Sequence, residues 1–510
     1  MSDDFLTSEQ TENYGRYVAE PNEVQLARYF HLDERDLAFI NQRRGKHNRL
    51  GIALQLTTAR FLGTFLPDLL QIPSFIRFYI AAQLNISRPE ILSRYAERDN
   101  TRWEHQGLIK LYYDYHDFGD FPWSFRLKRL LYTRAWLSNE RPGLLFDFAT
   151  AWLLQNKILL PAASTLTRLI GEVRERASRR LWRRLALLPD SWQKTQLDGL
   201  LEIPEGQRMS VLEEMRKGPV TISGPSFTDA LERYTRLRSM EFSRLNFSGL
   251  PAIQLRNLAR YAGMASVKYI SRMPDERRLA VLTAFVKAQE ISALDEAVDV
   301  LDMLILDITR SAKNIGQKKR LRTLKDLDRA ALLLARACTL LLDENTDEAA
   351  LRQAIFRRIP KDKLAESVGK VNELARPQDT HFQDEMVEQY GRVKRFLSAM
   401  LRDLHFQAAP AGEHTLSAIH YLAELSGSKK RILDDAPEQI ISGPWKRLVY
   451  DRDGRILRAG YSLCLLERLQ DSLRRRDLWL ENSDRWGDPR QKLLQGAEWQ
   501  AQRIPVCRAL

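Results

Sequence analysis

Apolar residues recur every three or four positions along most of this 510-residue chain, and strand signals are almost absent. Such spacing gathers the apolar side chains on one face of each helix, which must then be buried. The one candidate for strands is residues 445–457, where Arg452, Asp453 and Gly454 suit a hairpin turn. We therefore expect a mainly all-α protein, with several small helical domains followed by a region of long helices, and at most one short β-hairpin.

Prolines and glycines cluster between the periodic segments and predict where the chain divides. We expect a first helical domain over residues 1–86 and a second helical region over 87–200. Residues 205–410 are expected to form a long-helix scaffold or dimerisation region, and residues 411–510 a last segment.

The net charge is +13, which favours a polyanionic partner such as DNA because basic side chains displace the counterions of phosphates. The three cysteines are far apart, so neither a disulfide framework nor a zinc cluster is indicated. The N-terminus has no secretory signal pattern, and no apolar stretch is long enough to span a bilayer. We expect a cytoplasmic protein with no membrane and no small-molecule substrate among its partners.

A basic turn precedes the third predicted helix. It contains Arg43, Arg44, Gly45, Lys46, His47, Asn48 and Arg49. Its cations can bind phosphate, and its amide and guanidinium groups can read base edges. We place Gly45 at the C-cap of the preceding helix. A solvated basic turn explains the same composition equally well, and both readings stay open.

Residues 144–188 predict a helix-turn-helix unit. A short apolar helix is followed by a turn and by a long helix that we expect Ser164 to cap. The long helix carries seven arginines as candidate DNA contacts. They are Arg168, Arg174, Arg176, Arg179, Arg180, Arg183 and Arg184. Glu172 and Glu175 can pair with only part of this charge.

Three further basic segments are weaker candidates. Arg98 and Arg102 flank Trp103, which we interpret as a core anchor, so only the two arginines are carried as DNA contacts. Residues 318–325 are expected to be a solvated basic loop between two long helices, and residues 474–476 are similar. Residues 295–308 have one acidic and one apolar face, which suits protein contact.

No motif for catalysis is found. The sequence lacks a phosphate-binding GxxxxGK[ST] loop, a GxSxG elbow and an HExxH helix. A nuclease-like polynucleotidyl transferase would need acidic residues on a strand-rich core to hold paired divalent metals, and no run of strands supplies one. We therefore expect that this chain, as given, is not an enzyme and that it holds no catalytic residue, metal or cofactor.

Several stretches in order along the chain resemble the Tn-three family of replicative transposases. They are residues 43–51 (RRGKHNRLG), 101–105 (TRWEH), 461–469 (YSLCLLERL) and 485–490 (RWGDPR). The resemblance implies helical domains that bind the transposon's terminal inverted repeats as double-stranded DNA, and a helical region that forms a homodimer. It also implies an RNase H-like domain with a DDE triad and magnesium, which we expect to be missing here. On this resemblance, residues 1–86 are expected to be a DNA-binding domain and residues 411–510 a lead-in segment towards the absent catalytic domain.

Two alternatives stay open beside DNA binding for transposition. The chain could be a helical protein-interaction scaffold whose basic surface is incidental, or a subunit complemented in trans by a separately encoded DDE half. The sequence does not specify the DNA sequence bound, the target preference or the oligomeric state. It also does not separate a truncated gene product from a split transposase or a regulator.

Overall fold

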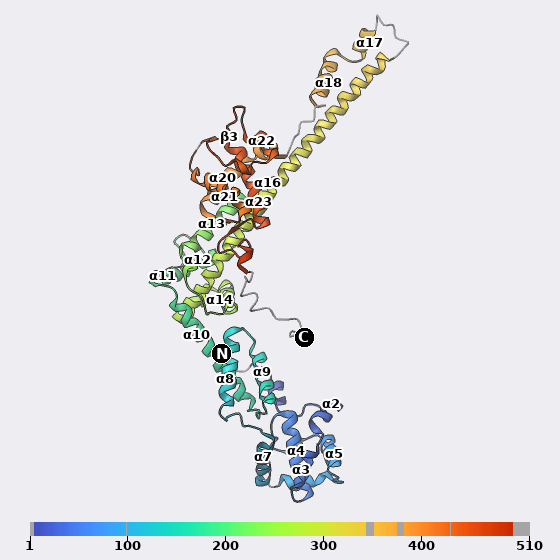
Figure 1. Cartoon of the computed structure of the whole chain (residues 1–510), viewed down its shortest axis with the longest axis vertical. Helices are drawn as coiled ribbons and strands as arrows, with labels where there is room; N and C mark the ends of the chain where they lie inside the picture. Colours follow the sequence, from blue (N-terminus) through green and yellow to red (C-terminus); the bar gives the residue numbers. More distant parts are fainter. Residues whose placement is uncertain (1–4, 98, 343–350, 375–381, 429, 493–510) are drawn as a thin grey trace. The chain divides into compact units, whose positions relative to one another are not determined.

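The computed structural model describes residues 5–97, 99–342, 351–374, 382–428 and 430–492 (Figure 1). The expected mainly all-α class is confirmed, since helices dominate these ranges and the strands form two small two-stranded sheets. Among the described helices, none is both long and apolar enough to cross a membrane. The contacts divide the chain into two units, each built from separate segments. The four sequential domains expected above stay a prediction.

Unit 1 comprises residues 1–190 and 246–284. Its helices are α1 (Ser8–Asn13), α2 (Glu23–Gln25), α3 (Glu34–Asn41), α4 (Lys46–Leu62), α5 (Ser74–Gln83), α6 (Leu92–Ala96), α7 (Asp99–Tyr113), α8 (Trp123–Leu137), α9 (Pro142–Gln155), α10 (Ala163–Leu187), α14 (Ala252–Met264) and α15 (Val267–Ser271). A π-helical turn, η1 (Leu26–Phe30), follows α2.

The first core of unit 1 is organised around α4, whose residues from Leu50 to Ala59 are all buried. Gly51 lets the ring of Tyr95 lie directly on the helix, because a β-carbon there would meet that ring at 2.5 Å. Asp36 is 1% exposed and accepts hydrogen bonds from both Nη atoms of Arg60 and from Tyr113 Oη at 2.7 Å. This buried carboxylate therefore joins α3, α4 and α7.

The second core lies among α8, α9 and α10, which Figure 1 shows in cyan and green. It contains Leu127 and Leu131 of α8, Leu153 of α9, and Leu166 and Ile170 of α10, each less than 2% exposed. These residues repeat at helical spacing, so each helix turns one apolar face inward. The three helices form one bundle.

The C-terminal half of α10 supports a third cluster. Leu181 and Leu185 pack with Ala280, and partly buried Leu255 and Leu258 of α14 lie against them. Gln254 at the start of α14 donates hydrogen bonds to the carbonyl oxygens of Ala135 and Ser138, at 3.0 and 2.8 Å. The helix α14 is therefore joined to α8 and α10, although α14 and α8 are more than a hundred residues apart in the sequence.

Unit 2 comprises residues 191–245 and 285–510. Its helices are α11 (Ser191–Gly199), α12 (Val211–Met215), α13 (Gly224–Ser239), α17 (Leu351–Arg358), α18 (Lys361–Leu374), α19 (Phe382–Glu388), α20 (Tyr390–Asp403), α21 (Glu413–Glu424), α22 (Gly443–Val449) and α23 (Arg458–Arg475). The helix α16 (Asp275–Leu341) begins in unit 1 and continues through unit 2.

The four strands are short. Antiparallel pairs join β1 (Phe406–Ala408) to β4 (Leu478–Leu480), and β2 (Ile432–Leu433) to β3 (Ile456–Leu457). The hairpin expected over residues 445–457 differs from this arrangement, because Trp445 lies in α22 and β3 pairs with β2 instead. Only a single bridge from Tyr450 to Ile456 closes the expected turn. The buried Trp445 side chain explains the difference, since it anchors a helix in the core.

The expectation of a loop at residues 318–325 is wrong, because these residues lie inside α16. Lysine, arginine and glutamine are good helix formers, so a dense run of charge does not by itself interrupt a helix. Lys319 pairs with Glu385 at 2.8 Å and with Glu388 at 3.1 Å, which fixes this part of α16 to α19.

The acidic side of residues 295–308 makes contacts inside unit 2, and the expected contact with another protein stays a prediction. Asp299 accepts a hydrogen bond from Trp486 Nε1 at 2.8 Å, and Asp302 pairs with Arg474 at 2.9 Å. Asp295 accepts a hydrogen bond from the Ser483 hydroxyl at 2.5 Å. These carboxylates lie on one side of α16 and hold residues 470–486 against it.

Replacing Asp36 by asparagine should destabilise unit 1. Burial raises the pKa of Asp36, but the hydrogen bonds from Arg60 and Tyr113 and the charge of Arg60 outweigh it, so the net pKa lies below its usual value. We expect Asp36→Asn to lower the free energy of unfolding by about 2 kcal/mol, less than for a fully buried pair because Arg60 is 22% exposed. Thermal denaturation followed by circular dichroism measures this.

The lowered pKa also fixes the sign of the pH dependence. The contribution of Asp36 is present above the pKa of the unfolded carboxyl and is lost as pH falls through the lower, folded-state pKa. Asp114→Asn is the matched control, because the Asp114 side chain is 83% exposed. Equal melting temperatures for the two variants would contradict the assignment.

Candidate nucleic-acid interface

The basic turn joins α3 to α4 and has a defined backbone. Gly45 has φ of +85° and is the N-cap of α4, whereas the C-cap of α3 is Gln42. The expected C-cap role of Gly45 is therefore wrong, although the reason for glycine is the same, since a positive φ disfavours other residues. A β-carbon on Gly45 would also meet the His47 ring at 2.9 Å.

Part of the turn's polarity is used internally. Arg49 donates hydrogen bonds to the carbonyl oxygens of Arg43 at 3.0 Å and of Asn41 at 3.4 Å. Asn48 Nδ2 donates to the carbonyl oxygen of Arg44 at 2.8 Å. Arg43 is half-buried over the Phe39 ring, 5.5 Å from its centroid. These side chains shape the turn.

The remaining side chains of the turn point outward. Arg44 and Lys46 are exposed, and His47 is half-buried. Within the described ranges, no carboxylate lies at ion-pair distance from Arg44 or Lys46. Two free cations beside the start of a 17-residue helix, whose first N–H groups have no intrahelical acceptors, suit phosphate oxygens.

The predicted helix-turn-helix corresponds to α9, residues 156–162 and α10. The expected cap is wrong, because α10 starts at Ala163 and its N-cap, Ala162, makes no side-chain hydrogen bond. Ser164 is exposed within the first turn. The hydroxyl predicted to cap the helix is thus available at its surface, beside Thr165 and one turn before Arg168.

The arginines of α10 divide into three groups. Arg168, Arg179 and Arg183 pair with Glu172, Glu175 and Glu276, at 3.9, 2.5 and 3.7 Å. Arg180 and Arg184 bind neighbouring elements through Tyr132 Oη at 3.1 Å and the Gly249 carbonyl at 3.3 Å. Arg176 is exposed, whereas Arg174 is half-buried and desolvation lowers its pKa.

The three ion pairs leave these arginines available. The side chains of Arg168, Arg179 and Arg183 are 69–72% exposed. Pairs at that exposure contribute only about 0.2–1 kcal/mol, and a phosphate can replace the carboxylate. The helix α10 therefore presents arginines that can exchange a glutamate partner for a phosphate, and it does not form a fixed positive groove.

The segment around Trp103 differs from the expectation. Arg98 lies outside the described residues, and Arg102 donates to the carbonyl oxygen of Pro67 at 2.5 Å. Trp103 is 67% exposed, so its interpretation as a core anchor is wrong. His105 is the buried member of this segment and bonds Tyr95 Oη through Nδ1 at 2.9 Å. His105 lies four residues before the buried Ile109 and therefore on the same, inward face of α7. Trp103 lies on a different face of the helix.

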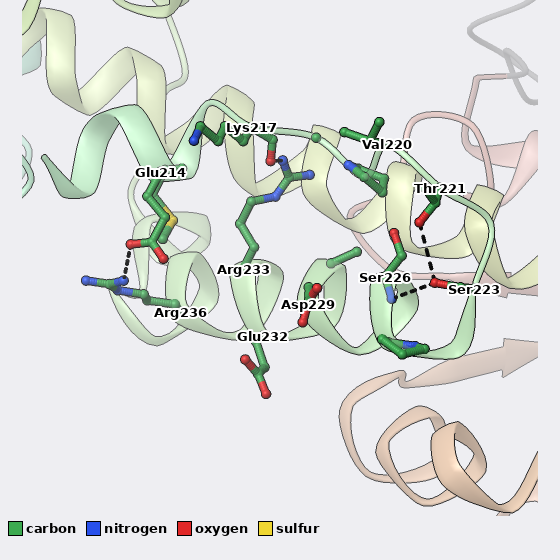
Figure 2. A pocket seen from close by; sticks show the side chains of 15 residues that line it. Glu214, Lys217, Val220, Thr221, Ser223, Ser226, Asp229, Glu232, Arg233 and Arg236 are labelled. Carbon is green, nitrogen blue, oxygen red and sulfur yellow. Dashed lines mark hydrogen bonds and ion pairs between the residues drawn. The ribbon is translucent and has the colours of Figure 1, made fainter. Parts of the chain in front are cut away.

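A cavity of about 600 Å³ lies in unit 2, between α13 and the chain that precedes it, and Figure 2 shows the side chains that line it. Its charged groups neutralise one another. Arg233 is 7% exposed and donates to the Lys217 carbonyl and to Glu296, while Arg236 pairs with Glu214 at 3.2 Å. Asp229 adds a negative charge to the lining. The cavity therefore offers no concentrated positive charge to an anion.

Among the described residues, no group of three or more His, Cys, Asp or Glu side chains is arranged to hold a metal ion.

Arg49 and Arg44 should differ when each is replaced by alanine. Arg49→Ala removes two charge-assisted hydrogen bonds to turn carbonyls and should lower the free energy of unfolding by about 1–2 kcal/mol. Arg44→Ala removes an exposed side chain and should leave stability within about 0.5 kcal/mol of the parent. Urea denaturation of both variants compares them, and equal losses would contradict the division of roles.

Comparison with known proteins gives consistent relatives. The family described as "Domain of unknown function (DUF4158)" matches residues 5–173. The transposase for transposon gamma-delta of Escherichia coli is 80% identical over all 510 residues, which cover 51% of that transposase. The transposase for transposon Tn501 of Pseudomonas aeruginosa is 29% identical over 93% of the chain and 48% of its own length. The chain spans about half the length of the curated relatives it matches.

These alignments correct one expectation. The prediction that the chain is not an enzyme is wrong, because the proteins aligned along nearly all of it are transposases, and it corresponds to a part of such an enzyme. The search for catalytic motifs did not detect this, since it tested short local patterns and not alignment over the whole chain. The chain is thus similar over its whole length to about half of the transposase for transposon gamma-delta.

Proposed function

We propose that this chain binds double-stranded DNA at the terminal inverted repeats of a transposon, as part of a transposase that acts in DNA transposition. The observation that carries the proposal is the 80% identity to the gamma-delta transposase across all 510 residues. The exposed cations of the basic turn and of α10 supply the chemistry, and both surfaces lie on unit 1.

The start of α10 is the proposed base-reading element. In helix-turn-helix proteins the N-terminal residues of the second helix contact base edges in the major groove. Here Ser164, Thr165 and Arg168 occupy that position, and Ser164 and Arg168 are exposed. Arginine recognises guanine through two hydrogen bonds, which makes Arg168 the main candidate for sequence discrimination.

The basic turn is the proposed phosphate-binding element. Arg44 and Lys46 are free to neutralise phosphates, whereas Asn48 and Arg49 are engaged by carbonyl oxygens. We therefore assign phosphate contact to Arg44 and Lys46, and we assign shaping of the turn to Asn48 and Arg49. Arg176, Arg179 and Arg183 are placed to add phosphate contacts along α10.

A homodimer is the proposed assembly. The described end of α16 and the helix α18 carry exposed apolar side chains, namely Leu332 (62%) and Leu341 (57%) on α16 and Val368 (43%) on α18. Such side chains suit burial against a second copy. Light scattering coupled to size-exclusion chromatography measures the mass, and a monomer at all concentrations tested would contradict this assembly.

The test of specificity uses a duplex that carries the terminal inverted repeat of transposon gamma-delta and a scrambled duplex of the same length. We expect Arg168→Ala to weaken repeat binding by about 1–3 kcal/mol, or roughly 5- to 150-fold, and to change scrambled binding far less. Fluorescence anisotropy at fixed salt gives both affinities. Equal affinity of the parent for the two duplexes would remove the sequence-specific claim.

The phosphate contacts have a different signature. Arg44→Ala combined with Lys46→Ala should weaken binding to both duplexes alike. It should also reduce the slope of log K against log salt by about 0.9 for each phosphate that is no longer neutralised. If the parent gives no DNA-dependent shift at moderate salt but forms a defined dimer, the chain acts as a protein-interaction scaffold instead.

A further inference from the structure

One long segment, most of it in unit 1, contains basic residues and no acidic ones. Between Glu241 and Asp275 the sequence has no aspartate or glutamate. The same stretch contains Arg244, Arg256, Arg260, Lys268 and Arg272. In a chain that has 66 acidic residues, an interval of this length without any concentrates positive charge. Four of these cations lie in or directly after α14 and α15.

The structure leaves those four cations unpaired. Arg256, Arg260, Lys268 and Arg272 are all exposed. Over the described part of the chain, none of them has a carboxylate within ion-pair distance or a side-chain hydrogen bond. The arginines of α10 contrast with them, since three of those pair with glutamates. The charge on α14 and α15 is therefore available without displacing a partner.

Helical spacing brings the cations together in pairs. Arg256 and Arg260 are four residues apart on α14, so they lie one turn apart on the same face. Lys268 and Arg272 have the same spacing on α15 and its C-cap. We call these four residues the α14–α15 face. Guanidinium groups bind phosphate through two parallel hydrogen bonds and an ammonium binds it as a point charge, so each pair suits phosphate oxygens.

The opposite side of α14 fixes this face to the rest of unit 1. Leu255 and Leu258 pack into the cluster formed by Leu181 and Leu185 of α10. Gln254 holds the start of α14 to the end of α8 through two carbonyl oxygens. Arg256 and Arg260 are thus carried on a helix that packs on the α8–α10 bundle, so the backbone that positions them is already in place.

Exposed apolar side chains lie beside the cations. Met264 is 82% exposed, Tyr269 is 56% exposed and Ile253 is 42% exposed. Such groups can pack on deoxyribose while the neighbouring cations bind phosphate. The combination distinguishes the α14–α15 face from an ordinary solvated helix, whose exposed positions mix both signs of charge.

We propose that the α14–α15 face is an additional DNA-binding surface, which holds the sugar–phosphate backbone of the duplex without reading its sequence. The inference rests on the proposed function, because it takes double-stranded DNA as the partner. It adds a site beyond the basic turn and α10. Backbone contacts position a protein on the duplex, whereas base contacts specify the sequence.

The test is a fourfold variant, Arg256→Ala, Arg260→Ala, Lys268→Ala and Arg272→Ala, in the full chain. We expect at least tenfold weaker binding to the repeat duplex and to the scrambled duplex alike, with an unchanged ratio between them. The slope of log K against log salt should fall by about 0.9 for each phosphate that the variant no longer neutralises, or by about 3.6 if all four residues bind one. Hydroxyl-radical footprinting should show a shorter protected segment.

The matched control removes four other exposed cations of unit 2, Lys394, Arg395, Lys446 and Arg452, which lie on α20, on α22 and in the turn before β3. It changes the net charge equally and should keep most of the affinity and the whole footprint. Arg256→Lys with Arg260→Lys retains the charge and should bind within about threefold of the parent. Circular dichroism melts check that each variant is folded.

The outcomes separate the two proposals. If the parent prefers the repeat and the fourfold variant matches the control in affinity, slope and footprint, the α14–α15 face is not a DNA-binding surface and the proposed function stands. If the fourfold variant loses the preference for the repeat, the face reads sequence and the backbone role is wrong. If the parent binds neither duplex, both proposals fail.

Discussion

The apolar stripe of α10 is the interaction on which the second and third cores of unit 1 depend. Its N-terminal half, through Leu166 and Ile170, closes the core with α8 and α9, and its C-terminal half, through Leu181 and Leu185, closes another with α14. Both halves follow one helical period, so a single helix can serve two cores. The polar side of the same helix carries the arginines. The packing of the apolar face of α10 against its neighbours therefore decides which of its arginines face solvent.

Helical periodicity was sufficient to predict the fold class, because the apolar positions of α4, α8 and α10 repeat at the helical interval. It was not sufficient for helix boundaries. Gly45 and Ser164 were each assigned to a helix end by residue type alone, yet a positive φ at Gly45 starts α4 and an uncapped Ala162 starts α10. The unbroken α16 also shows that dense charge does not end a helix that contains good helix formers.

The candidate site could be predicted as a set of residue types but not as an arrangement. The sequence located the basic turn, yet it could not show that Arg49 and Asn48 bind the turn's own carbonyls. Trp103 and His105 have the opposite burial from what their side chains alone suggest, since two positions along a helix change the face. The cations of α14 and α15 were missed because they are spread over the sequence. The acid-free interval from 242 to 274 was the available signal.

Unit 1 is completed by residues 246–284, which follow an intervening segment that belongs to unit 2. During synthesis, a nascent chain that has left the ribosome only as far as Asp190 carries Leu181, Trp182 and Leu185 without the side chains that later cover them. The cluster around Leu181 and Leu185 therefore cannot be buried until residues 246–284 have been translated. A gene fragment that ends between the two segments encodes a product in which Leu181 and Leu185 of α10 lack their packing partners. Such exposed apolar side chains favour aggregation, whatever the affinity of the product for DNA.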